Sequence, residues 1–306
     1  MKLHKTLARG TALLLCCATL FGTSGCGVAT ESTPVGSGST ADFHIYDIIP
    51  PSESIGELLQ NPHKPINNDS NIPQADKYIA LTFDDGPTGG MDGRTAHLLD
   101  GLKERGAHAT FFICGYRVKD FHQVIKRYLP EGHEVGNHTM DHIRLDRQSD
   151  GGLDQVRSNA DLIESYIGAR PTVMRPVGGA HNAATREAMK QLGMPIILWD
   201  LDTLDWKIRD AQNVKNNILS GARDGSIVLM HDLYSTTIEG VLSAMDVLQE
   251  QGYAFVTVSE LAQIKGVKLQ PGVVYNDMIS SDAPRKIRPD APPPRNPETY
   301  KKPQAA

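Results

Sequence analysis

Short apolar runs alternate with helical patterns through residues 76–275, and this alternation constrains the fold more than any other feature of the sequence. Four runs have the length and the β-branched or aromatic content of buried strands: 78–83, 109–114, 195–199 and 226–230. Apolar residues at helical spacing predict a helix that stops at Gly168 and another that begins with the capping-box pair Thr236 and Glu239. Strands that alternate with helices predict a parallel α/β barrel or a doubly wound sheet.

The N-terminal residues have the composition of a targeting segment. Basic residues precede an apolar run, 11–21, that is too short to span a bilayer. The "TSGC" that ends at Cys26 resembles the lipobox of bacterial lipoproteins, in which a cysteine is lipidated and becomes the mature N-terminus. We therefore expect residues 1–26 to be a lipoprotein-type signal peptide, with Cys26 anchoring an extracytoplasmic protein to the membrane. The alternative is an ordinary secretory signal and a released protein.

Composition separates two flanking segments from the domain and limits the partners. Residues 27–75 are rich in Ser, Pro and Asn and predict a tether, and the Pro-rich residues 276–306 predict a disordered tail. The net charge of −5 and the isoelectric point near 6.1 give no basic surface for nucleic acid. No feature indicates a protein partner. Cys114 lies in a strand-like run and is expected to pack in the core.

Two adjacent carboxylates, Asp84 and Asp85, directly follow the first predicted strand. One explanation is an ordinary turn, because Asp, Gly and Pro are common turn residues. His138 and His142 offer another, since four residues of separation on a helical turn would direct both imidazoles toward one divalent metal, although they could also be surface residues. Two histidines and one carboxylate leave an open position for water. One aspartate would then bind the metal and the other would accept a proton.

Three further polar residues also follow strands or expected strands. Arg175 lies in "MRPVGG", Asp205 in "WDLDTLDW" and His231 in "IVLMHD". Each has an ordinary structural explanation by itself: a helix cap, a solvated turn acid and a surface residue. In either predicted architecture the functional site lies at the carboxyl ends of the strands. We therefore expect these residues to share one site with the aspartate pair.

The same segments are similar to the motifs of a known family. "TFDDGP", "HTMDH", "RPVGG", "DTLDW" and "LMHD" follow the order of the five motifs of the polysaccharide deacetylases, which are carbohydrate esterase family four or the NodB-homology domain. The resemblance covers residues 76–265. It implies that the α/β fold is a distorted (β/α) barrel with fewer than eight regular units, forming a single catalytic domain at 76–275.

By position, the resemblance implies proton-transfer roles for four residues. Asp84 matches the general base, and Arg175 matches the residue that pairs with the base and orients it. His231 matches the general acid that protonates the departing amine. Asp205 matches the carboxylate that tunes this histidine.

The resemblance also implies a metal centre and an acetyl pocket. The matched ligands of a divalent metal are Asp85, His138 and His142. Zn²⁺ is favoured, and Co²⁺ or another divalent ion stays open. Trp199 and Leu229 match the apolar walls that receive the acetyl methyl group.

One motif departs from the family pattern. Val177 and Gly178 stand where the family usually has Pro-Tyr. The backbone N–H of Gly178 remains as a donor to the developing oxyanion, but the aromatic wall is missing. This departure affects the expected substrate more than the expected chemistry.

These features predict a metal-dependent hydrolase that removes N-acetyl groups from an amino-sugar polymer outside the cytoplasm. The tethered location favours peptidoglycan N-acetylglucosamine as the substrate. One alternative is an O-acetyl esterase acting on a polysaccharide such as acetylxylan. Another is a carbohydrate-binding module that has lost catalysis, which the intact set of matched residues disfavours.

Overall fold

The computed structural model describes residues 72–279, and Cys26, the expected signal peptide and almost all of the predicted tether and tail lie outside this range. At its centre is a parallel sheet in the order β3-β2-β1-β6-β5, with β7 also paired to β1. The strands of this sheet are β1 (Lys77–Asp84), β2 (Thr110–Ile113), β3 (Glu134–Asn137), β5 (Leu201–Asp202), β6 (Ile227–His231) and β7 (Tyr253–Val256).

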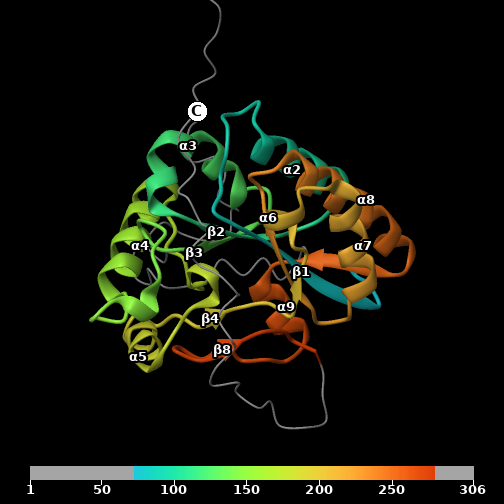
Figure 1. Cartoon of the computed structure of the whole chain (residues 1–306). Helices are drawn as coiled ribbons and strands as arrows, with labels where there is room; N and C mark the ends of the chain where they lie inside the picture. The colour runs from blue at the N-terminus through green and yellow to red at the C-terminus, as the bar shows by residue number, and fades with distance from the viewer. Residues whose placement is uncertain (1–71, 280–306) are drawn as a thin grey trace, which may run out of the picture. The chain divides into compact units, whose positions relative to one another are not determined.

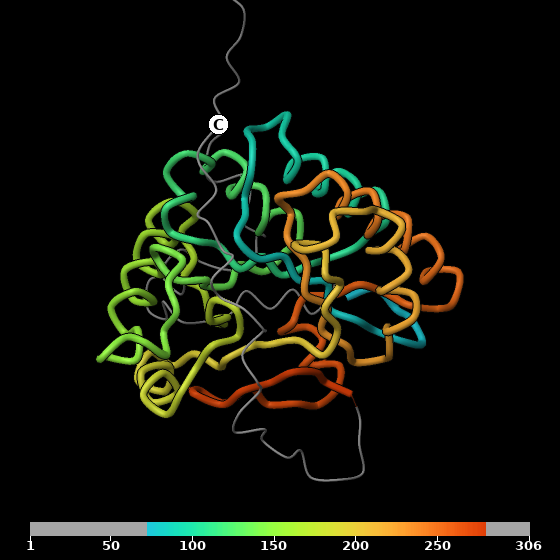
Figure 2. Tube along the Cα trace, in the orientation of Figure 1, coloured from blue at the N-terminus to red at the C-terminus, as the bar shows by residue number. Residues whose placement is uncertain are grey.

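A second parallel sheet, of β4 (Ile196–Ile197) and β8 (Val274–Tyr275), curves the strands into an incomplete ring. Met174 joins the two sheets, because it forms parallel bridges to Asn137 at the end of β3 and to Ile196 in β4. The chain then passes from β4 into β5, which pairs with β6 (Figure 2). This arrangement confirms the predicted distorted (β/α) barrel.

Helices cover the outside of the strands. Their bounds are α2 (Arg94–Glu104), α3 (Gly115–Tyr128), α4 (Leu153–Ile167), α5 (Ala183–Gln191), α6 (Asp205–Ile208), α7 (Ala211–Gly221), α8 (Ser235–Glu250) and α9 (Val258–Ile264), with 3₁₀ turns η2 (Leu145–Arg147) and η3 (Val177–Gly179). In the view of Figure 1, α3, α4 and α5 lie on one side of the strands and α2, α7 and α8 on the other. Within residues 72–279, no helix combines the length and the apolar content that crossing a membrane requires.

The observed elements follow the predicted alternation. Each of the four predicted strands overlaps an observed strand, although the one at 195–199 is reduced to the two residues of β4. The helix expected to stop at Gly168 is α4, and it ends as predicted. Gly168 adopts a φ of 71°, and its N–H bonds to the carbonyl oxygen of Glu164 at 2.8 Å.

The predicted capping box at the start of α8 is wrong. Thr236 already lies inside the helix, and the preceding extended residue is Tyr234, whose side chain makes no capping hydrogen bond. A capping hydroxyl must belong to the extended residue just before the helix, so Thr236 and Glu239 are in the wrong positions. A capping box does form at α9, between Thr257 and Glu260.

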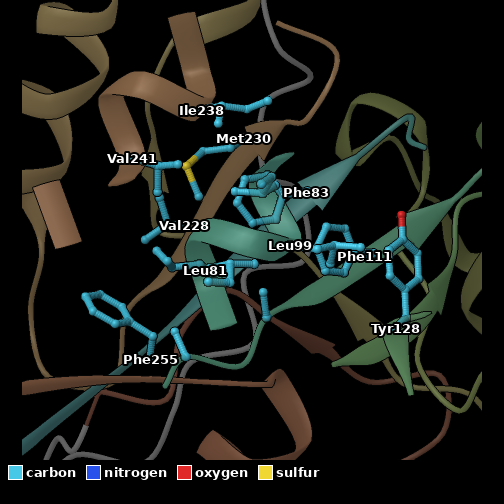
Figure 3. Close-up of a cluster of buried hydrophobic side chains, with 14 of the residues drawn as sticks. Leu81, Phe83, Leu99, Phe111, Tyr128, Val228, Met230, Ile238, Val241 and Phe255 are labelled. Carbon is cyan, nitrogen blue, oxygen red and sulfur yellow. The ribbon is translucent and has the colours of Figure 1, made fainter. Parts of the chain in front are cut away.

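The largest apolar cluster packs helices against the middle of the sheet (Figure 3). Phe83 stacks on Phe111 with ring centroids 5.3 Å apart, and Phe111 stacks on Tyr128 at 4.3 Å. Burying each such side chain contributes roughly 1.5–3 kcal/mol. Phe83 is 1% exposed and immediately precedes the first aspartate of the pair. This packing therefore fixes the position of the carboxyl end of β1.

Packing extends a few residues beyond the predicted domain limits. Ile72 is partly buried against the second apolar cluster. Met278 is fully buried, and its N–H donates to the carbonyl oxygen of Gly225 at 2.7 Å. Both residues therefore contribute to the folded part of the chain.

Candidate active site

The carboxyl ends of the strands bring the matched polar residues together. Asp84 is the last residue of β1 and is in register with His231, the last residue of the neighbouring strand β6. His138 follows β3, and Arg175 follows the bridge between the two sheets. Asp205 begins α6 just after β5. The five segments that carry the sequence motifs thus meet at one edge of the sheet.

Three side chains form a cluster of metal-ligand type. Nε2 of His142 lies 2.8 Å from Oδ1 of Asp85, and Nε2 of His138 lies 3.3 Å from the same oxygen. Asp85 has a φ of 69°, in a region that Asp tolerates better than most residues. Together with the thiol of Cys114, one donor atom from each residue lies within 4.8 Å of every other, so the group could hold a metal ion.

The two histidines do not lie on a helical turn, and that expectation is wrong. They are joined by a loop in which Thr139 and His142 have positive φ angles of 72° and 53°. Asn137, which is fully buried, supports this loop. Its Oδ1 accepts a hydrogen bond from the N–H of Thr139 at 2.9 Å, and its Nδ2 donates to the carbonyl oxygen of Val156 at 2.8 Å. A buried amide, not helical periodicity, makes the imidazoles converge.

The donor set fits a divalent cation. Nδ1 of His138 lies 2.7 Å from the carbonyl oxygen of Arg175, so this nitrogen donates and Nε2 faces Asp85. Burial acts to raise the pKa of Asp85, but His142 and His138 hold that pKa well below its usual value. Burial acts to lower the pKa of His138, but Asp84 and Asp85 raise it. An ionised carboxylate beside two imidazoles is a donor set typical of catalytic metal sites.

The buried side chain of Arg175 binds Asp84 on the side that faces the protein interior. The guanidinium is fully buried, and its Nη1 donates to Oδ1 of Asp84 and to Oγ1 of Thr82, both at 2.7 Å. Its Nε and Nη2 donate to two backbone carbonyls at the end of β4. Burial lowers the pKa of Arg175, and Asp84 opposes this shift. The other oxygen of Asp84, Oδ2, lies 3.8 Å from Nε2 of His138.

His231 is held by Asp205 in a second buried pair. Nδ1 of His231 lies 2.9 Å from Oδ1 of Asp205. The other oxygen of Asp205 accepts hydrogen bonds from the backbone N–H of His231 at 2.7 Å and from the hydroxyl of Thr237 at 2.8 Å. Burial acts to lower the pKa of His231, but Asp205 and, more weakly, the aspartate pair raise it to about 10. At neutral pH this imidazole is therefore protonated, with Nε2 not engaged by Asp205.

The residues matched to the acetyl pocket lie nearby. Leu229, 5% exposed, is in β6 two residues before His231. The ring of Trp199 lies 5.5 Å from the guanidinium carbon of Arg175. Gly178 has a φ of 61° within η3, a conformation that favours glycine. Their roles toward a substrate stay predictions.

Two buried groups beside the site have no function assigned from the sequence. Cys114, interpreted as a packing residue, belongs to the cluster of metal-ligand type. Asp232 accepts a hydrogen bond from the hydroxyl of Thr95, and burial raises the pKa of Asp232 to about 6. A side chain at Gly86 would clash with this carboxylate, so Gly86 permits its close approach. Asp232 had a signal in "LMHD", whereas nothing in the strand-like run around Cys114 indicated chemistry.

Comparisons with known proteins point to one family of enzymes. The family model described as polysaccharide deacetylase matches residues 71–197. The chain is 42% identical over 213 residues to the peptidoglycan-N-acetylglucosamine deacetylase PgdA of Listeria monocytogenes, covering 69% of this chain and 44% of that protein. It is 37% identical over 200 residues to a peptidoglycan-N-acetylglucosamine deacetylase of Bacillus cereus, covering 63% of this chain and 92% of that protein. The chain thus spans less than half of the Listeria relative.

Solved structures with the same fold match this chain over nearly their whole length. The peptidoglycan deacetylase PdaC from Bacillus subtilis is 41% identical with a TM-score of 0.58, covering 62% of this chain and 92% of that one. A family 4 acetyl xylan esterase from Clostridium thermocellum, solved with a cobalt ion, is 31% identical with a TM-score of 0.61. That match covers 66% of this chain and 98% of the esterase.

Proposed function

The chain belongs to the polysaccharide deacetylase family, and on this premise we propose that it hydrolyses N-acetyl groups of peptidoglycan N-acetylglucosamine. One observation carries the proposal: Asp84 and His231 end neighbouring strands in register, beside a cluster of Asp85, His138 and His142. This arrangement supports the roles of proton acceptor and protonated donor around a site that can hold a divalent cation. Amide hydrolysis needs all three elements, because an amine leaves only when it is protonated.

We assign Asp85, His138 and His142 as the residues that hold the metal, and Zn²⁺ as the ion, with Co²⁺ or another divalent ion as the alternative. When bound, such a cation polarises the acetyl carbonyl and lowers the pKa of water in the site. The carbonyl oxygen of Arg175 accepts a hydrogen bond from Nδ1 of His138 and so fixes the ring orientation. The fixed ring directs Nε2 of His138 toward Asp85.

Asp84 is assigned as the general base. Arg175 donates to one of its oxygens at 2.7 Å, which holds the carboxylate in place. The other oxygen then takes the proton of the attacking water. The backbone N–H of Gly178 is assigned to stabilise the oxyanion, and Trp199 and Leu229 to contact the acetyl methyl.

His231 is assigned as the general acid. Asp205 holds Nδ1 of the ring, so the proton to be transferred is on Nε2. A pKa of about 10 keeps this proton in place at neutral pH. The departing sugar nitrogen accepts it as the C–N bond breaks, which yields a glucosamine unit and acetate.

The substrate assignment rests on the family relatives and on the tethered location. Both the Listeria and the Bacillus cereus relatives are named for peptidoglycan N-acetylglucosamine, and they exceed the xylan esterase in identity. O-deacetylation of a polysaccharide such as acetylxylan is the second candidate, since an ester is cleaved more easily than an amide by the same groups.

Acetate release from the purified full chain tests the proposal. Peptidoglycan, chitin oligomers, poly-N-acetylglucosamine and acetylxylan are compared, each with and without a chelator. We expect the highest rate on peptidoglycan and loss of the rate with chelator. A preference for acetylxylan would favour the esterase, and inactivity on all four would favour a binding module without catalysis.

The location and domain limits are part of the proposal. Residues 1–26 are assigned as a signal peptide with lipidation at Cys26, 27–75 as a tether, 76–275 as the catalytic domain and 276–306 as a tail. Cys26→Ser should move the protein from the membrane fraction to the soluble fraction. Unchanged fractionation of this variant would contradict the lipid anchor.

A further inference from the structure

The one-turn helix α6 connects the general acid to an exposed arginine. Its first residue, Asp205, pairs with His231, and Arg209 directly follows its last residue. Arg209 has a φ of 55°, in the left-handed region that arginine rarely adopts. Such conformations cost free energy and are concentrated at functional sites, where the surrounding structure holds them. The conformation of Arg209 therefore calls for a reason in the function of the site.

The side chain of Arg209 is stacked on an aromatic ring beside the general acid. Its Cζ lies 3.4 Å from the ring centroid of Tyr234, and its Nε donates to the carbonyl oxygen of Trp206 at 3.0 Å. Tyr234 is partly buried, and its ring centroid lies 6.3 Å from that of His231. One aromatic ring thus separates the guanidinium from the proton donor, so Arg209 lies at the edge of the proposed active site.

Arg209 has no carboxylate partner in the part of the chain that the structure describes. Over residues 72–279, its side chain forms no ion pair, and its two terminal nitrogens make no hydrogen bond. Arg105, Arg127 and Arg170, by contrast, each pair with a carboxylate on the outside of the fold. A guanidinium can bind a carboxylate through two parallel N–H groups. The open end of Arg209 is therefore suited to a carboxylate that a ligand supplies.

The surroundings of Arg209 favour an anion there over one at the metal centre. Burial raises the pKa of Tyr234 to about 12, and the charges of Arg209 and Arg117 act in the opposite direction. The phenol is therefore neutral at neutral pH and does not repel a carboxylate. Asp84 and Asp85 would repel an anion bound next to them. An anionic part of the substrate is thus expected to bind beside the aspartate pair, at Arg209.

We propose that Arg209, held on the ring of Tyr234, binds a carboxylate carried by the sugar next to the N-acetylglucosamine that is deacetylated. The site would then select anionic glycan strands over neutral ones. Peptidoglycan offers this carboxylate in two forms. Stem peptides carry it where they are attached, and the lactyl group of muramic acid carries it where the peptide has been removed. The inference rests on the proposed function and names the feature of the substrate that the same site recognises.

Acetate release by the full chain is measured on peptide-bearing strands and on peptide-free strands. Each is compared with the same strands after their carboxylates are converted to amides. Arg209→Asn is the main variant, because Asn tolerates a positive φ and removes the charge. We expect its kcat/KM to fall by about 10-fold on the strands that carry the recognised carboxylate, mainly through KM. The loss should be much smaller on the amidated strands, and the strand type with the larger loss identifies the lactyl or the peptide carboxylate.

A matched control and a second variant separate the guanidinium from net charge. Lys207→Ala removes an exposed charge from the same helix and should keep the wild-type preference for anionic strands. Arg209→Lys keeps the charge but lacks the paired N–H groups, so it should lose part of the preference. Raising the salt concentration should weaken the preference in the wild type and in Arg209→Lys, but not in Arg209→Asn, since salt screens an exposed pair.

The outcomes distinguish this inference from the function on which it rests. An equal loss on anionic and amidated strands in Arg209→Asn would overturn the role of Arg209 and leave the proposed function standing. An equal loss of preference in Lys207→Ala would also contradict it, because net charge alone would then explain the effect. A wild type that releases acetate from none of these strands would overturn both.

Discussion

Two buried ion pairs lie in the candidate active site, and they are built in opposite ways. In the pair of Arg175 and Asp84, the cation is enclosed, 0% exposed, while one carboxylate oxygen remains for the site. In the pair of His231 and Asp205, the carboxylate is enclosed, 0% exposed, with hydrogen bonds to both oxygens. One ring nitrogen of the histidine remains for the site. The member that is enclosed therefore decides whether the pair can accept or donate a proton.

Asp84→Asn should have the largest effect on activity, and it tests the pair that accepts a proton. An amide keeps the size of the side chain and still accepts from Arg175, but it cannot take a proton from water. We expect kcat to fall by about 10⁴-fold, the upper end for a general acid–base group, with the metal content unchanged.

Steady-state kinetics and atomic spectroscopy of the metal measure these two quantities. His138→Ala is the matched control, since it should lose metal and activity together. Retained turnover in Asp84→Asn would remove the general-base assignment.

Arg175→Met should have the next largest effect, this time on stability. It removes the cation from a fully buried pair and leaves the charge of Asp84 without its partner. Breaking a buried ion pair in this way costs about 3–5 kcal/mol in the free energy of unfolding, which denaturant titration measures. The exposed pair of Arg157 and Asp154 is the control, since Arg157→Met should cost no more than about 1 kcal/mol. Equal costs for the two variants would mean that the buried pair is not a structural support.

The positions of the strand ends could be predicted from the sequence, whereas the strand register and the hydrogen bonds that orient the active-site side chains could not. Apolar runs that stop at Asp84 and His231 are visible in the sequence, because burial on both faces of a parallel strand requires them. The register between these two residues depends on strand pairing, to which no local pattern points. The helical spacing of His138 and His142 was misleading, since a buried amide of Asn137 shapes a loop there. Tertiary hydrogen bonds leave no periodic signal.

Asp205→Asn should change how stability and activity depend on pH, because it removes the carboxylate that holds His231 protonated. The charge and hydrogen bond of Asp205 raise the pKa of His231 above its unfolded value, to about 10. The stability from this pair is therefore complete below about pH 6.5, and it is lost as pH rises through about 10.

The difference in unfolding free energy between wild type and Asp205→Asn should accordingly shrink across this window, measured on the metal-free protein. In kcat/KM, the alkaline limb should move to lower pH, so that activity at pH 8 falls by about 10-fold more than at pH 6. A loss that is equal at both pH values would contradict the tuning role of Asp205.

The smallest effects should come from the two threonines that support the pairs, Thr82 and Thr237, both fully buried. Thr237→Val deletes a hydrogen bond to the carboxylate of Asp205, so the free energy of unfolding should fall by about 1.5–3 kcal/mol. The pKa of His231 should rise, because the Asp205 carboxylate loses a stabilising donor and holds the imidazolium proton more strongly. Thr82→Val removes an acceptor of Arg175 and should cost a similar amount, but Nη1 keeps Asp84 as a partner and the alkaline limb should not move. The pH profiles of the two isosteric variants therefore separate the pair that donates a proton from the pair that accepts one, and identical profiles would contradict the distinction.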